Sequence, residues 1–212
     1  MTVRSQSLCP NVFKCGDTLV DSRDGIKYPT VLIGTQCWFQ INLKATKYVN
    51  DDSIPHISDA STWCNLTTGA WCVYNNDLSN SLTFGLLYNW YAVNDSRGLC
   101  PKGWYIPTNN DFNVLINYLG GTTTAGPAMK ATSFSPPYTG TNSSGWTGLA
   151  SCYRTSSGCG FQGGNNQTGQ WWSSTVISTS TWLLDLDYSN CCANLFINPM
   201  IQGASVRCMK VY

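Results

Sequence analysis

Charged side chains are scarce in this chain of 212 residues, because Asp, Glu, Lys and Arg together make up only 11% of it, against about a quarter in ordinary globular proteins. The 12 basic and 11 acidic residues nearly cancel, so the sequence offers no basic surface for nucleic acid or for an anionic membrane. Histidine is almost absent, with His56 alone. One histidine gives little basis for a zinc site or for a Ser-His-Asp or Cys-His arrangement. We therefore expect no metal, no cofactor and no enzymatic activity.

Several sequence signals are also missing. No run of 18 apolar residues occurs, which argues against a membrane span. Residues 1–10 contain no apolar segment of the kind that a secretory signal needs. No Gly-rich loop follows a strand-like run and opens a helix, so nucleotide binding has no support. If the protein acts outside the cell, either a signal was removed or the protein leaves by another route, as a phage virion component does on lysis.

Cysteine, in contrast, is abundant, with 11 residues. An odd number leaves at least one thiol free or paired between chains, and the density favours an oxidising environment with about three to five disulfides. The short loops between them suggest the pairs Cys9–Cys15 and Cys152–Cys159. The adjacent Cys191 and Cys192 are poor partners for each other, because a bridge would strain the peptide between them. Structural free thiols and a metal site are the alternatives.

Aromatic and uncharged polar residues take the place of the missing charges. The chain has 9 Trp, 11 Tyr and 7 Phe, together with many Ser, Thr, Asn and Gly. This mixture is typical of extracellular or virion surface proteins, which is where we expect this protein to act. Low charge also gives weak colloidal repulsion, which suits a protein held in an assembly.

The hydrophobic pattern predicts an N-terminal arm, residues 1–18, followed by one domain, residues 19–212. Thr108 and Asp111 form a capping-box pattern ahead of an amphipathic helix over 108–119, which Gly120 and Gly121 end. A shorter helix is expected over 84–93, and residues 44–82 read as long loops. Two helices followed by a run of strands indicate an α+β fold. The predicted strands are 19–20, 27–33, 36–39, 145–153, 170–174, 181–188, 193–197 and 204–211.

Four sequence blocks stand out by their order along the chain. They read Gly85-Leu-Leu-Tyr-Asn-Trp-Tyr-Ala-Val-Asn-Asp95, Gly98-Leu-Cys-Pro-Lys-Gly-Trp-Tyr-Ile-Pro-Thr108, Gly169-Gln-Trp-Trp-Ser-Ser-Thr175 and Gly203-Ala-Ser-Val-Arg-Cys208. Together they resemble the Fibrobacter succinogenes major paralogous domain family over residues 31–212. The resemblance implies a C-type-lectin-like fold, in which two helices pack on short, mostly antiparallel strands joined by long loops.

The segment over residues 175–203 is the candidate recognition site. In relatives of the family the matching stretch is sometimes diversified while the flanking blocks stay fixed, which implies an exposed and irregular recognition surface here. Apolar residues such as Phe196, exposed at a strand edge, suit partner binding. The alternative is that Leu195, Phe196 and Ile197 belong to an ordinary core. The candidate binding residues are Asp187, Ser189, Asn190, Asn194, Asn198 and Met200.

Three further side chains call for an interpretation. Asp185 and Asp187 alternate along a strand, so they project from one face at a spacing that glycoside cleavage or calcium binding can use. The apolar residues that alternate with them favour a plainer reading, in which both aspartates face water. Arg207 lies within a predicted strand, where an arginine is usually buried and bonded to a carboxylate or to carbonyls.

These observations favour a non-enzymatic binding protein displayed on an outer surface, such as a phage virion. Its partner would be a receptor, a glycan or a protein on a host or cell surface. The main alternative is a structural virion decoration or fibre protein that contacts capsid or tail proteins or forms a homo-oligomer. A third alternative is an enzyme similar to the formylglycine-generating enzymes, which share the C-type-lectin-like fold and use a pair of thiols.

Overall fold

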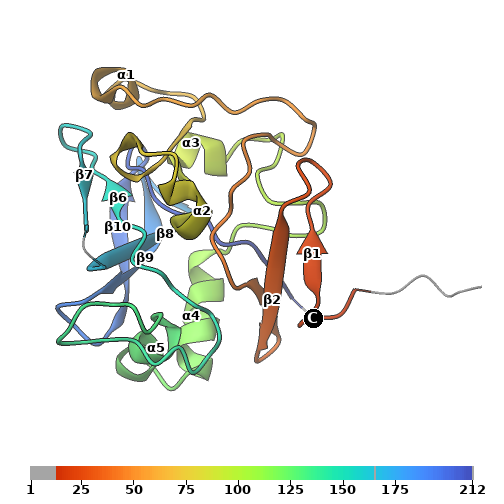
Figure 1. Cartoon of the computed structure of the whole chain (residues 1–212), viewed down its shortest axis with the longest axis vertical. Helices are drawn as coiled ribbons and strands as arrows, with labels where there is room; N and C mark the ends of the chain where they lie inside the picture. Colours follow the sequence, from red (N-terminus) through yellow and green to blue (C-terminus); the bar gives the residue numbers. More distant parts are fainter. Residues whose placement is uncertain (1–12, 165, 212) are drawn as a thin grey trace, which may run out of the picture.

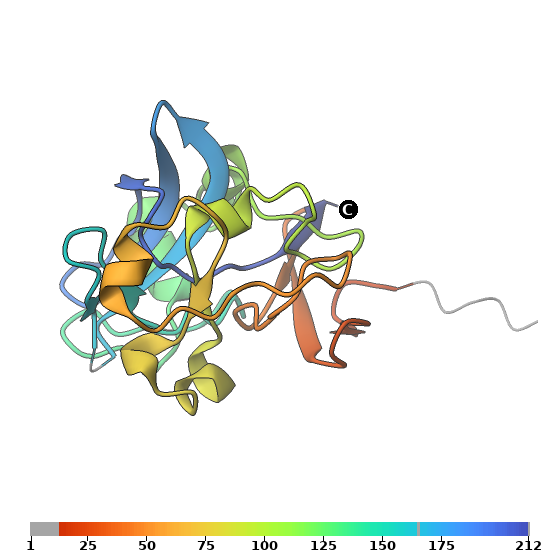
Figure 2. The same ribbon diagram turned by 90° about the horizontal axis from the view of Figure 1, so that it is seen from above.

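The computed structural model describes residues 13–164 and 166–211. They form an α+β fold whose paired strands run antiparallel. A four-stranded sheet has the order β1-β2-β3-β11, and a three-stranded sheet, which we call the C-terminal sheet, has the order β10-β9-β8. The two sheets lie on opposite sides of the molecule in Figures 1 and 2, with the C-terminal end of the chain beside the four-stranded sheet.

The four-stranded sheet begins with the predicted hairpin. Strands β1 (Thr18–Val20) and β2 (Lys27–Ile33) pair as expected, and β3 (Gln36–Phe39) follows as the predicted third strand. The last strand, β11 (Met209–Val211), pairs with β3. It is shorter than the predicted strand over 204–211, because residues 203–205 make single bridges to three different partners instead of continuing one ladder.

The C-terminal sheet replaces the irregular segment that the sequence suggested. Strands β8 (Thr168–Ile177), β9 (Ser180–Asp187) and β10 (Ala193–Pro199) form a continuous antiparallel meander over most of residues 175–203. The predicted strands over 181–188 and 193–197 are confirmed as β9 and β10, and the expectation that the segment as a whole is irregular was wrong. The polar residues of the segment sit at turns and at a sheet edge, where they interrupt the apolar pattern without ending the strands.

The longest helix agrees with its prediction. Helix α4 (Asn109–Tyr118) has Thr108 as N-cap, and a complete capping box joins Thr108 and Asp111. Phe112, Leu115 and Ile116 are buried along one side. The second longest helix, α5 (Thr122–Met129), follows directly and was not predicted.

The predicted helix over 84–93 was wrong. That stretch divides into the end of α2 (Asn80–Phe84), strand β5 (Leu87–Tyr88) and the short helix α3 (Trp90–Val93). Gly85 explains the break, since its φ of 77° is left-handed and a Cβ there would lie 2.8 Å from the Asn42 side chain. Packing against residues 42 and 43 therefore overrides the local helical pattern.

Short elements and long connections make up the rest. Residues 44–82 are mostly loop, as predicted, with α1 (Ala60–Cys64), β4 (Trp71–Cys72) and the 3-10 turn η1 (Tyr74–Asn76) within them. The predicted strand over 145–153 reduces to β6 (Tyr153–Arg154), paired with β7 (Phe161–Gln162). None of the helices in the described residues is long and apolar enough to cross a membrane.

Two hydrophobic cores meet at the C-terminal sheet. Neighbouring residues of a strand point to opposite faces, so Trp172 packs in the first core and Trp171 in the second. Leu183 and Leu184 of β9 divide in the same way. The sheet is therefore covered on both faces over this length, which is why its central residues are buried without alternation.

Three disulfides cross-link the described part of the chain: Cys15–Cys37, Cys64–Cys159 and Cys100–Cys208. The number agrees with the prediction, but both suggested pairs were wrong, because Cys15 and Cys159 bond to distant cysteines and Cys152 is free. Cys9 lies outside the described residues. Cys191 and Cys192 do not bridge each other, as expected, and their sulfur atoms are 3.6 Å apart.

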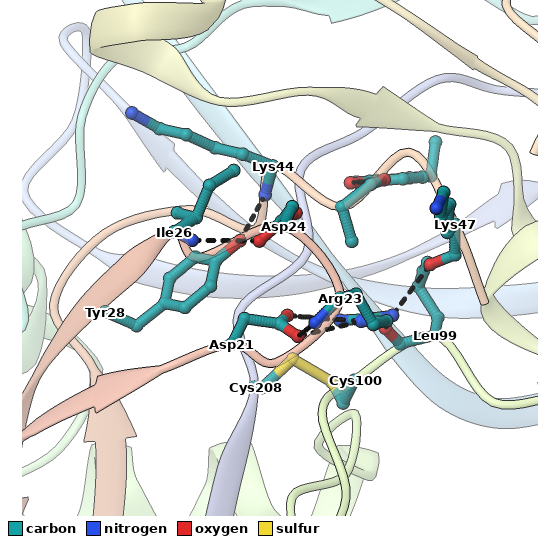
Figure 3. A network of polar contacts seen from close by, with 12 residues as sticks. Asp21, Arg23, Asp24, Ile26, Tyr28, Lys44, Lys47, Leu99, Cys100 and Cys208 are labelled. Carbon is teal, nitrogen blue, oxygen red and sulfur yellow. Dashed lines mark hydrogen bonds and ion pairs between the residues drawn. A yellow bond between two sulfur atoms is a disulfide. The ribbon is translucent and has the colours of Figure 1, made fainter. Parts of the chain in front are cut away.

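Buried cations join loops that are distant in sequence. In Figure 3, Arg23 lies next to the Cys100–Cys208 bridge and faces Asp21 across a 2.6 Å ion pair. The same guanidinium donates to the carbonyls of Lys47 and Leu99, at 2.7 and 2.8 Å. Arg154, also buried, donates at 2.8–2.9 Å to the carbonyls of residues 159, 57 and 58. Each guanidinium thus satisfies carbonyls that no ladder reaches.

Candidate functional site

Four of the six predicted binding residues gather around the turn between β9 and β10. Asp187 Oδ1 accepts hydrogen bonds from the backbone N and the hydroxyl of Ser189. Asn190 Oδ1 accepts from the Cys192 amide at 2.8 Å and from the Asn194 side chain at 3.3 Å. Ser189 is exposed, and the other three are half-buried. The turn is therefore a compact polar cluster with few free hydrogen-bonding groups.

The Lys130 side chain forms hydrogen bonds with the backbone of this turn. The residue is buried, and its Nζ donates to the carbonyls of Asp187 at 2.7 Å, Asn190 at 2.6 Å and Tyr138 at 3.2 Å. Burial lowers the pKa of Lys130, and the charge of Asp187 opposes this shift. Burial also acts to raise the pKa of Asp187, but hydrogen bonds from Ser189 and Thr168 outweigh it, so that this pKa lies below its ordinary value. These contacts fix the conformation of the turn.

The other two predicted residues lie elsewhere. Asn198 is opposite Thr181, toward the far end of β10. Met200 is half-buried against the first core, and its carbonyl accepts a hydrogen bond from the Trp90 amide at 2.9 Å. The six residues therefore do not form one site. A polar turn lies at one end of the strands, whereas Asn198 lies near the opposite end of β10 and Met200 directly follows that end.

That opposite end carries a group of apolar side chains, which we call the distal patch: Val176 and Phe196 on one face of the sheet and Ile177, Trp182 and Ile197 on the other. Four of these side chains are 41–49% exposed and Trp182 is half-buried. Strand pairing sets Ile197 of β10 opposite Trp182 of β9. Val176 and Ile177 of β8 lie opposite Thr181 and Ser180 at the same end of β9. Sequence reasoning singled out Phe196 but missed Val176 and Ile177. Their position directly before the turn at Ser178 and Thr179 could have indicated that these two apolar side chains are exposed.

Asp185 contradicts its prediction. The side chain is buried instead of facing water, and its Oδ1 accepts a hydrogen bond from Gln170 Nε2 at 2.8 Å. Gln202 Nε2 in turn donates to Gln170 Oε1 at 2.6 Å. Burial raises the pKa of Asp185 to about 6, and the charge of Asp187 adds to this rise. Residues 202 and 170 cover the face that the sequence pattern left open to solvent.

Three of the free thiols, those of Cys72, Cys152 and Cys192, have raised pKa values. Burial raises the pKa of Cys72 to about 12 and that of Cys152 to about 11. A hydrogen bond with Cys191 raises the pKa of Cys192, and burial adds to it. A reactive cysteine needs the opposite shift, toward thiolate at neutral pH. This environment suits structural thiols.

Two surface recesses of about 310 Å³ each occur elsewhere. One is largely apolar and is lined by residues that include Leu99, Trp104 and Ile106. The other is polar and includes Tyr91, Asn94, Asp95 and Arg97. Hydrogen bonds from Arg97 lower the pKa of Asp95 to about 2, so this carboxylate is a poor proton donor at neutral pH.

His56 is the one histidine of the sequence. Within the described residues, no group of three or more His, Cys, Asp or Glu side chains is placed to hold a metal ion. His56 stacks on Trp71 with ring centres 4.2 Å apart. It is exposed and lies in a loop, as expected of a surface histidine.

Comparison with known proteins gives one result. A family model described as the Fibrobacter succinogenes major domain matches residues 31–210. No curated protein matches the chain. No solved structure matches it either. The four blocks noted in the sequence all lie within the matched range.

Proposed function

We propose that this chain, which belongs to the Fibrobacter succinogenes major domain family, is a binding protein that recognises its partner through the distal patch. The patch is the observation that carries the proposal. Exposed apolar side chains of β8 and β10 accompany the half-buried Trp182 of β9 at this end of the sheet, and apolar clusters mark sites of association. Asn198 beside it supplies an amide for orientation.

The rigidity of the C-terminal sheet supports this function. Trp171 and Trp172 anchor the sheet in two cores, and Lys130 fixes the turn at its other end. A recognition surface on such a frame loses little conformational entropy on binding. We further propose that the architecture is C-type-lectin-like, since α4 and α5 accompany mostly antiparallel strands and long loops.

The partner we propose is a protein or glycan on a host or cell surface, with the protein displayed outside the cell, for example on a phage virion. Three disulfides support an oxidising, extracellular environment. Raised thiol pKa values argue against the enzyme alternative. The structural alternative, contacts between copies of the chain, is favoured by the position of β10 at the edge of the C-terminal sheet.

The test compares matched surface variants. Labelled protein is applied to a glycan array and to intact bacterial cells, with Val176→Ser/Ile177→Ser as the patch variant and Leu78→Ser/Leu82→Ser as the control. Leu78 and Leu82 are also exposed, at 58% and 77%. They belong to a different part of the sequence, with Leu82 in α2 and Leu78 just before it. We expect the patch variant to keep its melting temperature and lose at least tenfold in binding, and the control to bind normally. Equal binding by both variants, or no binding by the unmodified protein, would reject the proposal.

A further inference from the structure

Strand β10 forms the edge of the C-terminal sheet, and its sequence reads nearly the same in both directions. The sheet order is β10-β9-β8, so β9 occupies only one side of β10. From residue 194 to 198 the strand reads Asn-Leu-Phe-Ile-Asn, a chemical palindrome centred on Phe196. The whole strand, Ala193–Pro199, contains no charged residue.

The pairing pattern shows which backbone groups of β10 point outward. On β8, the Gln170 carbonyl and the Trp172 amide form hydrogen bonds with Ser205. The backbone N–H and C=O groups of these even-numbered residues therefore point away from β9, and those of the odd-numbered residue between them point toward β9. Neighbouring residues alternate in this respect. With the observed registers, Leu183 and Asp185 then bond to Phe196 and Asn194. The amides and carbonyls of Leu195 and Ile197 point away from the sheet.

No other part of the described chain satisfies these outward groups. The backbone of Leu195 and Ile197 has no hydrogen-bond partner outside the strand ladder among residues 13–164 and 166–211. The side chains of Phe196 and Ile197 are 49% and 48% exposed. Natural proteins usually protect such an edge with charges, bulges or a covering segment. Here only Pro199 at the end of the strand, which has no N–H to donate, hinders the pairing of another strand with this edge.

We propose that β10 pairs with β10 of a second copy of this chain, antiparallel and about a two-fold axis at Phe196. An isologous contact requires a self-complementary surface, which the palindrome supplies. Leu195 then lies opposite Ile197 of the second copy, and each such pair exchanges both backbone hydrogen bonds. The two Phe196 side chains become a non-hydrogen-bonded pair, in which side chains lie closest together.

The same symmetry fixes the register. Asn194 lies opposite Asn198 of the second copy, on the face that carries Phe196. Side-chain amides are therefore paired with amides, and apolar side chains with apolar side chains. A shift by two residues would set Phe196 against an asparagine and lose these matches. Without charged residues on the strand, the pairing brings no like charges together. The product is one continuous six-stranded sheet.

This inference goes beyond the proposed binding function. In the dimer, Val176 and Ile177 lie on β8, away from the shared edge. They remain available to a partner at both ends of the joined sheet. Self-association needs no ligand, so it is measured separately from attachment to cells or glycans.

Charges introduced at Phe196, on the two-fold axis, test the proposal. We expect sedimentation velocity on the full chain to show a concentration-dependent dimer for the unmodified protein. Phe196→Lys and Phe196→Glu should each be monomeric, because two like charges would face each other, while an equimolar mixture of the two variants should regain a dimer. Melting temperatures near that of the unmodified protein would show that both variants are folded.

Val176→Lys is the matched control, since Val176 is 46% exposed on the same sheet but lies off the edge. This variant should dimerise like the unmodified protein. If it abolishes the dimer, the sheet face is the interface and the edge pairing is wrong. A monomeric unmodified protein, or a mixture of Phe196 variants that stays monomeric, also overturns the proposal.

Discussion

Arg207 carries a positive charge at 0% exposure, and it makes no ion pair within the described part of the chain. Its guanidinium donates to the carbonyls of Gln40, Trp146 and Thr147 and to the Asn42 side chain. It also lies 4.1 Å from the centre of the Trp146 ring, a favourable cation–π contact. The sequence predicted a carboxylate or carbonyls as partners, and the carbonyls are confirmed. Three carbonyl groups that no strand could satisfy thereby gain a donor.

Replacing Arg207 should therefore be costly. Arg207→Leu leaves several buried acceptors unpaired, each worth about 1–3 kcal/mol, so we expect a loss of more than about 3 kcal/mol in the free energy of unfolding. Arg207→Lys should recover only part of this, because an ammonium cannot reproduce the planar fork of donors. Urea denaturation with the disulfides intact measures both, with Lys102→Leu at an exposed site as control. Similar losses at residues 207 and 102 would contradict the role given to the guanidinium.

Asp185 makes the stability depend on pH. Its pKa is raised to about 6 by burial, so the folded state binds this proton more tightly than the unfolded state. That contribution is complete below the ordinary pKa of about 4 and is lost as the pH rises through 6. Asp185→Asn should thus stabilise the protein at pH 7.5, by on the order of 1–3 kcal/mol, and the advantage should shrink toward pH 4. Melting curves of both proteins across this range measure it, and a constant difference would rule out titration of Asp185 as the cause.

At the scale of single elements, α4 offers a direct test of packing. Leu115→Ala removes a fully buried side chain from the second core, and we expect a loss of about 2–5 kcal/mol. Asn113→Ala, on the exposed side of the same helix, should change stability by no more than about 0.5 kcal/mol. Chemical denaturation of the two variants decides this. Equal effects would show that the buried face has been misassigned.

Elements with strong local signals were predictable, and those set by distant contacts were not. Helix α4 was predictable because its capping residues, Thr108 and Asp111, and its apolar stripe all lie within one short stretch of sequence. The stretch around Gly85 has an apolar pattern that favours a helix, but close approach of residues 42 and 43 sets its backbone. Asp185 was misplaced for the same reason, because the residues that cover it, Gln170 and Gln202, come from other segments. The distal patch likewise depends on strand register, which the sequence does not state.

For the whole molecule, the pattern of bridged and free cysteines is the clearest prediction. Alkylation of the denatured, non-reduced protein followed by proteolysis and mass spectrometry should find cross-linked peptides for the three bridges. Modified thiols should appear at Cys72, Cys152, Cys191 and Cys192. Short spacing misled the sequence interpretation, since all three bridges close loops of 22 to 108 residues. A peptide joining Cys152 to Cys159 would contradict the structure.

The positions of two disulfides also determine how the protein bears mechanical force. Tension applied between residues 13 and 211 passes from Cys15 to Cys37, follows the backbone to Cys100 and crosses to Cys208. Residues 101–207, which include the whole C-terminal sheet, lie in a closed covalent loop beside that path. Pulling on the ends can separate β11 from β3, but it cannot draw β8, β9 or β10 out by their own backbone. A surface presented by this sheet therefore keeps its shape under shear for as long as the Cys100–Cys208 bond remains intact.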